Sequence, residues 1–175
     1  NDLDGTPYAD PAEMSLALVR AAQNTGIGLT LLPTLYMRSG FNATGLRDDQ
    51  RRFASTPESI ARIVESVQRQ TINDPRINVG VALHSLRAVP PAALNELATY
   101  AQTKRLPVHI HIAEQTQEVD DCLAHTGQRP IEWLLNHAAV DARWNLVHAT
   151  HTTPQELAGI AQAGASIVIC PSTEG

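Results

Sequence analysis

Two histidines and a glutamate stand at the end of an apolar segment, in the sequence PVHIHIAEQ at residues 107–115. His109 and His111 are two residues apart, so on a strand their side chains point to the same face. An imidazole in such a place is a natural ligand for a cation such as Zn²⁺. Glu114 follows in the next loop, from which a carboxylate can take a proton from a metal-bound water. These residue types and their spacing therefore predict metal-assisted hydrolysis.

Polar side chains also follow the other apolar segments of the chain. His84 and Arg87 follow INVGVAL, and His148 follows WNLV. The others are Thr34 and Tyr36 after IGLTLLP, His151 after WNLVHA, and Ser172, Thr173 and Glu174 after ASIVIC. The guanidinium of Arg87 offers two parallel donors that fit a carboxylate, with a surface ion pair as the alternative interpretation.

The histidines differ in how well they fit a functional role. His111 fits a metal ligand because a glutamate follows it by three residues, and His148 stands at a comparable strand end. For His109 we favour a hydrogen-bonded core residue over a ligand. Surface roles are favoured for His125 and His137. A capping or surface role is favoured for His151, which lies near the start of the next helix.

Helix and strand patterns alternate along the chain and must position these groups. Helices are predicted for residues 10–26 with Asp10 as N-cap, 56–74 with Thr56 as N-cap, 90–105, 116–139 with a break near Gly127 and Pro130, and 153–164 with Thr153 as N-cap. Strands are predicted for residues 27–33, 77–84, 106–113, 144–149 and 165–170. Residues 37–55 form a polar connection too long to be ordinary, and such loops are often functional.

The predicted strands are short and apolar without alternation, which is typical of parallel strands covered by helices. Two α/β architectures compete, an open doubly wound sheet and an eight-stranded barrel. The sequence contains no glycine-rich phosphate loop of the GxGxxG type, which the first architecture usually carries. Chemical groups at the ends of successive strands are what a barrel active site needs. The pattern therefore favours the barrel.

The composition excludes several classes of protein. The 175 residues are 43% hydrophobic and carry a net charge of −5, which suits one domain with a core and no nucleic-acid partner. No apolar run is long enough to span a membrane. Cys122 and Cys170 are interpreted as reduced thiols of a cytoplasmic protein. The chain starts without methionine and ends directly after an apolar run, so we expect a fragment of a longer protein.

HIHIAEQ followed by VHATH resembles the deaminase branch of the amidohydrolase superfamily. More narrowly, six sequence segments taken together are similar to the formimidoylglutamate deiminases. The segments are DGTPYADP, GVALHSLRAVP, VHIHIAEQTQEVDDC, RPIEWLLNH, DARWNLVHATHTT and CPSTEG, and the resemblance covers nearly the whole chain. Related purine deaminases tend to carry asparagine in place of Glu174.

The resemblance implies a (β/α)₈ barrel with a small flanking β-domain and one Zn²⁺, held by an HxH pair on strand one, a histidine on strand five and an aspartate on strand eight. His111 matches the strand-five ligand, Glu114 the glutamate that shuttles protons, and His148 the histidine that polarises substrate and water. His84 and Arg87 match groups near the substrate, the arginine suiting a glutamyl carboxylate.

The HxH pair and the strand-eight aspartate have no counterpart in the chain. The resemblance therefore implies a single partial barrel domain over residues 1–175, with five parallel strands that correspond to strands three to seven, and no activity on its own. The whole protein is expected to be a cytoplasmic homodimer. It would convert a small molecule, N-formimino-L-glutamate, to N-formyl-L-glutamate and ammonia in histidine degradation.

Two alternatives remain open at this point. The first is another deaminase of the superfamily, acting on an aminopurine, S-adenosylhomocysteine or a triazine. Arg87 and Glu174 argue against it, since a heteroaromatic base needs no guanidinium partner. The second is a non-enzymatic β/α fragment that binds no metal.

Overall fold

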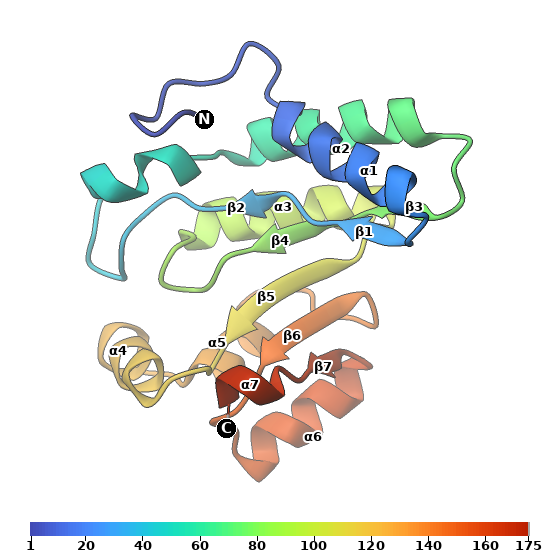
Figure 1. The fold of residues 1–175 in the computed structure, drawn as a ribbon. Coiled ribbons are helices and arrows are strands. Elements are labelled where there is room, and N and C mark those ends of the chain that lie inside the picture. Colours follow the sequence, from blue (N-terminus) through green and yellow to red (C-terminus); the bar gives the residue numbers. More distant parts are fainter. Residues whose placement is uncertain (175) are drawn as a thin grey trace.

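Parallel strands and helices alternate along the chain in the computed structural model, which describes residues 1–174 (Figure 1). The helices are α1 (Glu13–Thr25), α2 (Pro57–Thr71), α3 (Pro91–Lys104), α4 (Thr116–Thr126), α5 (Pro130–His137), α6 (Pro154–Ala163) and α7 (Pro171–Glu174), with a 3₁₀ helix η1 (Asp48–Phe53). The strands are β1 (Leu29–Leu31), β2 (Thr34–Leu35), β3 (Ile77–Val79), β4 (Val81–Leu83), β5 (Val108–Ile112), β6 (Trp144–His148) and β7 (Ser166–Val168).

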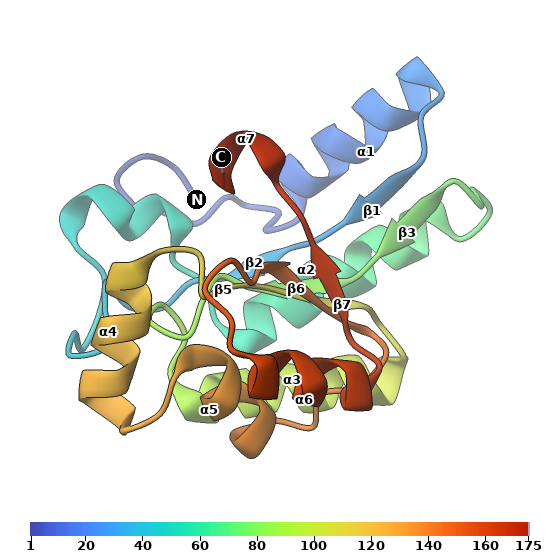
Figure 2. The same ribbon diagram turned by 90° about the horizontal axis from the view of Figure 1, so that it is seen from below.

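The strands pair in chain order, as a barrel requires. A five-stranded sheet has the order β2-β4-β5-β6-β7, β1 pairs with β3, and every pairing is parallel. In Figure 2 the helices α3, α5 and α6 lie on one side of the strands, and α7 and the N-terminal segment lie on the other. The prediction of a partial barrel with parallel neighbours is confirmed.

The first two predicted strands are each divided in two, which the sequence pattern did not indicate. Pro33 separates β1 from β2, because it has no N–H to donate to the neighbouring strand. Gly80 separates β3 from β4, where the chain passes very close to Pro107. A Cβ at this position would lie 2.6 Å from the carbonyl oxygen of Pro107, so the close approach requires glycine.

Helix starts follow the predicted caps in two of three cases. The hydroxyls of Thr56 and Thr153 accept hydrogen bonds from backbone N–H groups in the first turns of α2 and α6. Asp10 was wrongly predicted as an N-cap. Its carboxylate accepts the N–H of Ala12 at 2.8 Å within a preceding turn, and α1 begins only at Glu13. No described helix has the length and apolar character needed to cross a membrane.

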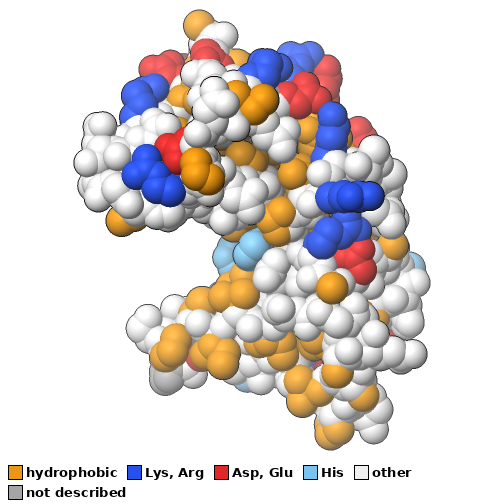
Figure 3. Space-filling model, turned by 90° about the vertical axis from the view of Figure 1, so that its right-hand side faces the viewer, with side chains coloured by type: hydrophobic (Ala, Val, Ile, Leu, Met, Phe, Trp, Pro, Cys, Tyr) orange, Lys and Arg blue, Asp and Glu red, His pale blue; other side chains and the backbone are white. Residues whose placement is uncertain are grey.

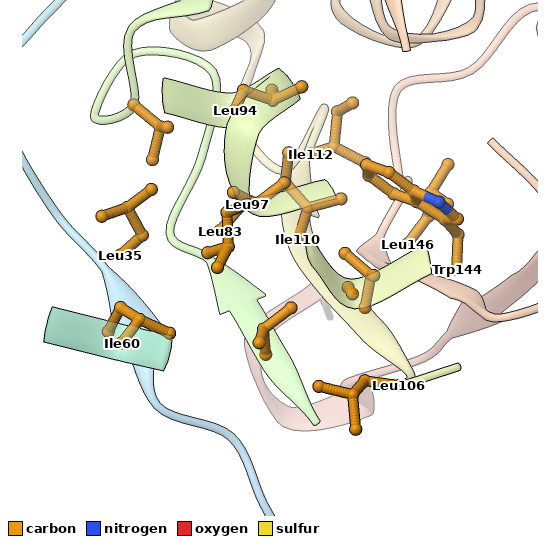
Figure 4. Close-up of a cluster of buried hydrophobic side chains, with 14 of the residues drawn as sticks. Leu35, Ile60, Leu83, Leu94, Leu97, Leu106, Ile110, Ile112, Trp144 and Leu146 are labelled. Carbon is orange, nitrogen blue, oxygen red and sulfur yellow. The ribbon is translucent and has the colours of Figure 1, made fainter. Parts of the chain in front are cut away.

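The core lies between the sheet and the helices that cover its outer side (Figure 4). Leu83, Ile110 and Leu146 come from three adjacent strands, and Leu94 and Leu97 pack on them from α3. These five side chains are at most 1% exposed. Truncating such a residue to alanine typically costs about 2–5 kcal/mol. This packing fixes the strands and therefore the position of their C-terminal ends.

Candidate functional site

Four of the predicted side chains converge at the C-terminal ends of β4, β5 and β6. The imidazole centroids of His84 and His111 are 5.3 Å apart, and those of His111 and His148 are 5.6 Å apart and nearly parallel. Nε2 of His148 lies 3.6 Å from Oε1 of Glu114. Figure 3 shows histidine and hydrophobic side chains along a hollow in the surface. The ends of these three parallel strands therefore bring the four residues to one place.

His111 is oriented as a metal-binding imidazole would be. Its Nδ1 lies 2.7 Å from the backbone carbonyl oxygen of His84, and the backbone N–H of His111 donates to the same oxygen at 3.3 Å. A carbonyl can only accept, so Nδ1 must carry the proton and Nε2 keeps its lone pair. Histidines that bind metals typically donate their other N–H in this way. The donor set of this residue thus fits zinc.

His109 lies on the same face of β5 but deeper in the sheet. In register it stands beside Ala82 and Asn145, whereas His111 stands beside Val147 near the open end. Its Nδ1 is buried and has no hydrogen-bond partner within residues 1–174. Burial, and then the nearby His111, lower the pKa of the His109 imidazole. The predicted role of a hydrogen-bonded core residue is therefore not met within residues 1–174, since His109 is half-buried and its Nδ1 has no partner there.

His148 reaches the site through an unusual backbone conformation. Trp144 and Leu146 point to the helix-covered face of β6, and strict alternation would send His148 the same way, beside Ile112. Instead φ is +72° at His148 and +50° at Ala149, a left-handed region that non-glycine residues rarely adopt. The imidazole consequently stacks on His111. Strained backbone of this kind clusters at functional sites.

Glu174 binds the other side of His148. Its Oε1 lies 3.1 Å from Nδ1 of His148 and accepts the N–H of Cys170 at 2.9 Å. The carboxylate thereby favours a proton on Nδ1 and leaves Nε2 directed toward Glu114. Ligand atoms of His148, Cys170 and Glu174 lie within 4.8 Å of one another, the spacing of a metal site. The hydrogen bonds to Glu174 already account for this arrangement.

His84 is a neutral imidazole at neutral pH. Burial is the main cause, and the nearby His111 and Arg87 add to it, so that the pKa of His84 falls to about 4. Its Nδ1 lies 3.1 Å from the hydroxyl of Ser85, and the ring of Tyr36 packs edge-on against it at 4.5 Å. A neutral ring can donate or accept a hydrogen bond toward a substrate.

Arg87 is exposed, and Arg38 holds the loop in which it lies. Nε and Nη2 of Arg38 donate to the carbonyl oxygens of Arg87 and Leu86 at 2.9 and 3.0 Å. Nη1 donates to the carbonyl oxygen of Phe41 at 3.2 Å, so the single side chain of Arg38 joins the long 37–55 connection to the loop after β4. After burial and the nearby His111, the charge of Arg87 adds to the lowering of the His84 pKa, so its guanidinium lies near the site.

Replacing Arg38 by methionine should lower the free energy of unfolding of this chain by about 2 kcal/mol, because partly buried carbonyls lose charged donors. Urea unfolding followed by circular dichroism measures the change. Arg62→Met is the matched control, since within residues 1–174 Arg62 forms an exposed helix pair with Glu58, worth about 0.3–0.5 kcal/mol. Equal losses in the two variants would mean that the Arg38 hydrogen bonds contribute no more than a surface ion pair.

Glu118 and Arg38 were not predicted, and the role of Glu174 was not predicted either. Glu174 was named as a strand-end group and a family marker, not as a partner of His148. Glu118 binds the backbone of Ala113 and Glu114, and its only signal was its place in the first turn of a predicted helix. Arg38 lies in an irregular segment without periodicity and gave no signal. Of the capping and surface roles expected for His151, capping is excluded, because Thr153 caps α6.

Comparison with known proteins agrees with this geometry. Residues 6–175 match the model of a protein family described as the amidohydrolase family. The chain is 48% identical over 174 residues to a formimidoylglutamate deiminase of Pseudomonas aeruginosa, covering 99% of this chain and 38% of the relative. It is similar to the crystal structure of an amidohydrolase from Brucella melitensis, with a TM-score of 0.93 and 46% identity over 99% of this chain and 38% of that one.

A more distant structure carries a metal. It is an adenosine deaminase from Xanthomonas campestris with bound zinc, with a TM-score of 0.72 and 26% identity over 87% of this chain and 32% of that chain. The chain thus spans less than two fifths of the length of the proteins it matches.

Proposed function

Since this chain belongs to the amidohydrolase family, we propose that it forms the central part of a zinc-dependent deiminase. The substrate would be N-formimino-L-glutamate, which water converts to N-formyl-L-glutamate and ammonia. We use the term full-length enzyme for the protein that contains these 175 residues and has the length of the relatives. The observation that carries the proposal is the convergence of His111, Glu114 and His148, together with likeness to a formimidoylglutamate deiminase.

His111 would hold zinc through Nε2, with the remaining ligands supplied from outside these 175 residues. When bound, zinc lowers the pKa of a water molecule to about 7 and so makes a nucleophile available at neutral pH. The residues of this chain would then orient the substrate and move protons.

Glu114 would act as the general base and then as the general acid. Its carboxylate takes a proton from the attacking water and delivers it to the nitrogen that leaves as ammonia. His148 lies 3.6 Å away through Nε2, where it can stabilise the charge that develops at the tetrahedral carbon. Glu174 would keep His148 in the orientation that this requires.

His84 and Arg87 would bind the substrate. The neutral imidazole of His84 borders His111, and the exposed guanidinium of Arg87 lies on the loop after β4. A guanidinium binds a carboxylate with two parallel hydrogen bonds. This favours an amino-acid-derived substrate over a neutral base.

Arg87→Lys in the full-length enzyme should lower kcat/KM for formiminoglutamate by at least about tenfold, or 1.4 kcal/mol, because lysine keeps the charge and loses the paired donors. Steady-state release of ammonia measures this. A substrate analogue without carboxylates is the control, and its kcat/KM should change little. Equal losses on both substrates would show that Arg87 is structural.

A second candidate is deamination of an aminopurine, which the likeness to a zinc-containing adenosine deaminase supports. Glu174 no longer argues against it, because its carboxylate is bound to His148 and Cys170. Assays of the full-length enzyme with formiminoglutamate and with adenosine separate the two. Turnover of adenosine alone would overturn the proposed substrate.

A further inference from the structure

Glu118 lies in the first turn of α4, and its carboxylate binds two consecutive backbone N–H groups outside the helix. Oε1 accepts a hydrogen bond from the N–H of Ala113 at 3.1 Å, and Oε2 accepts one from the N–H of Glu114 at 3.0 Å. Both donors belong to the short connection between β5 and α4. One side chain thereby fixes the backbone that leads into Glu114.

This arrangement differs from an ordinary helix cap. In a capping box, the glutamate at the third helical position accepts the N–H of the N-cap residue itself. Glu132 does this in α5, where it accepts the N–H of Arg129 at 3.3 Å. Glu118 occupies the same position in α4 but passes over the N-cap residue Gln115 to bind the two residues before it. Capping of α4 alone does not require those partners.

The backbone that Glu118 binds has an uncommon conformation. Ala113 is fully buried and has a φ of +51°, which a non-glycine residue keeps only where its surroundings fix it. The carbonyl oxygen of Ala113 accepts the N–H of His151 at 3.0 Å, so both sides of this residue are hydrogen-bonded. The left-handed turn directs Glu114 toward His148.

We propose that Glu118 is a positioning residue that keeps the Glu114 carboxylate beside His148 by way of the backbone of Ala113 and Glu114. The inference rests on the general-base role of Glu114 in the proposed function. A displacement of about 1 Å in a reacting group can cost about 10²-fold in rate. The effect of losing Glu118 therefore falls mainly on kcat, because its hydrogen bonds hold the backbone that leads into Glu114.

The test is Glu118→Gln in the full-length enzyme. Glutamine has the same shape but only one acceptor oxygen, so its amide NH₂ faces one of the two N–H groups and that bond is lost. We expect kcat to fall about 10- to 100-fold, KM to change less than about twofold, and zinc content to stay unchanged. Glu132→Gln, the same change at an ordinary cap, leaves kcat and KM unchanged. Should the glutamine variant not fold, Glu118→Asp is the second test. Aspartate keeps the charge but is too short to reach both N–H donors, so the same fall in kcat is expected.

A double-mutant cycle separates positioning from general damage. Adding E118Q to E114Q should leave the kcat of E114Q unchanged, because the carboxylate that Glu118 positions is already absent. The positioning role is wrong if E118Q lowers the kcat of E114Q by the same factor as that of the wild type, or if it raises KM and spares kcat. The E114Q variant by itself tests the proposed function. Wild-type turnover in E114Q would refute the role of Glu114, independently of the kcat and KM of E118Q.

Discussion

Replacing Glu114 by glutamine in the full-length enzyme is expected to lower kcat by about 10²–10⁴-fold, the usual contribution of a general acid–base group. Glutamine keeps the shape of the side chain and its place 3.6 Å from His148, but it cannot accept the proton of the attacking water. Zinc should stay bound, because the proposed metal ligand is Nε2 of His111 and not the carboxylate of Glu114. Steady-state ammonia release and metal content of the purified variant measure the two effects.

Glu96→Gln serves as the control for this experiment. Glu96 is exposed on α3, away from the ends of the strands, and the same change there should alter neither kcat nor zinc content. Wild-type turnover in E114Q would remove Glu114 from the mechanism. Loss of zinc in E114Q would instead make its carboxylate a ligand.

Much of the fold follows from local chemistry that the sequence displays. Thr56 and Thr153 cap their helices through hydrogen bonds that span only three residues, so the pattern alone predicts them. The division of the second strand at Gly80 depends on how close Pro107 comes from the next strand. Such a contact between distant segments leaves no local pattern to detect.

The site shows the same division between local and distant causes. His111 and His148 converge because the ends of neighbouring parallel strands meet, which the order of elements predicts. The direction of the His148 side chain could not be predicted, since alternation along WNLVH places it on the helix-covered face. Only the left-handed backbone at His148 and Ala149 turns it inward. Glu118 was missed because a first-turn glutamate has the sequence signature of an ordinary cap.

Replacing one histidine of β5 should remove bound zinc, whereas replacing the other should leave the zinc content unchanged. The two histidines lie on one face of the strand, but His109 lies roughly 6–7 Å deeper, given the rise of a strand over two residues. His111 has Nδ1 committed to the carbonyl oxygen of His84 and Nε2 free at the open end. Nδ1 of His109 is buried and has no hydrogen-bond partner within residues 1–174, and the residue stands beside Asn145, away from the open end.

His111→Gln in the full-length enzyme should therefore remove most of the zinc and, with it, all measurable turnover, because a catalytic zinc site needs its protein ligands together. His109→Gln is the matched control from the same strand and face, and it should retain the zinc content of the wild type. Metal analysis of both purified variants, with circular dichroism to verify folding, measures the difference. Zinc lost from H109Q and kept by H111Q would reverse the assignment and place the metal one layer deeper, where Glu114, beyond the end of the strand, could not reach its water.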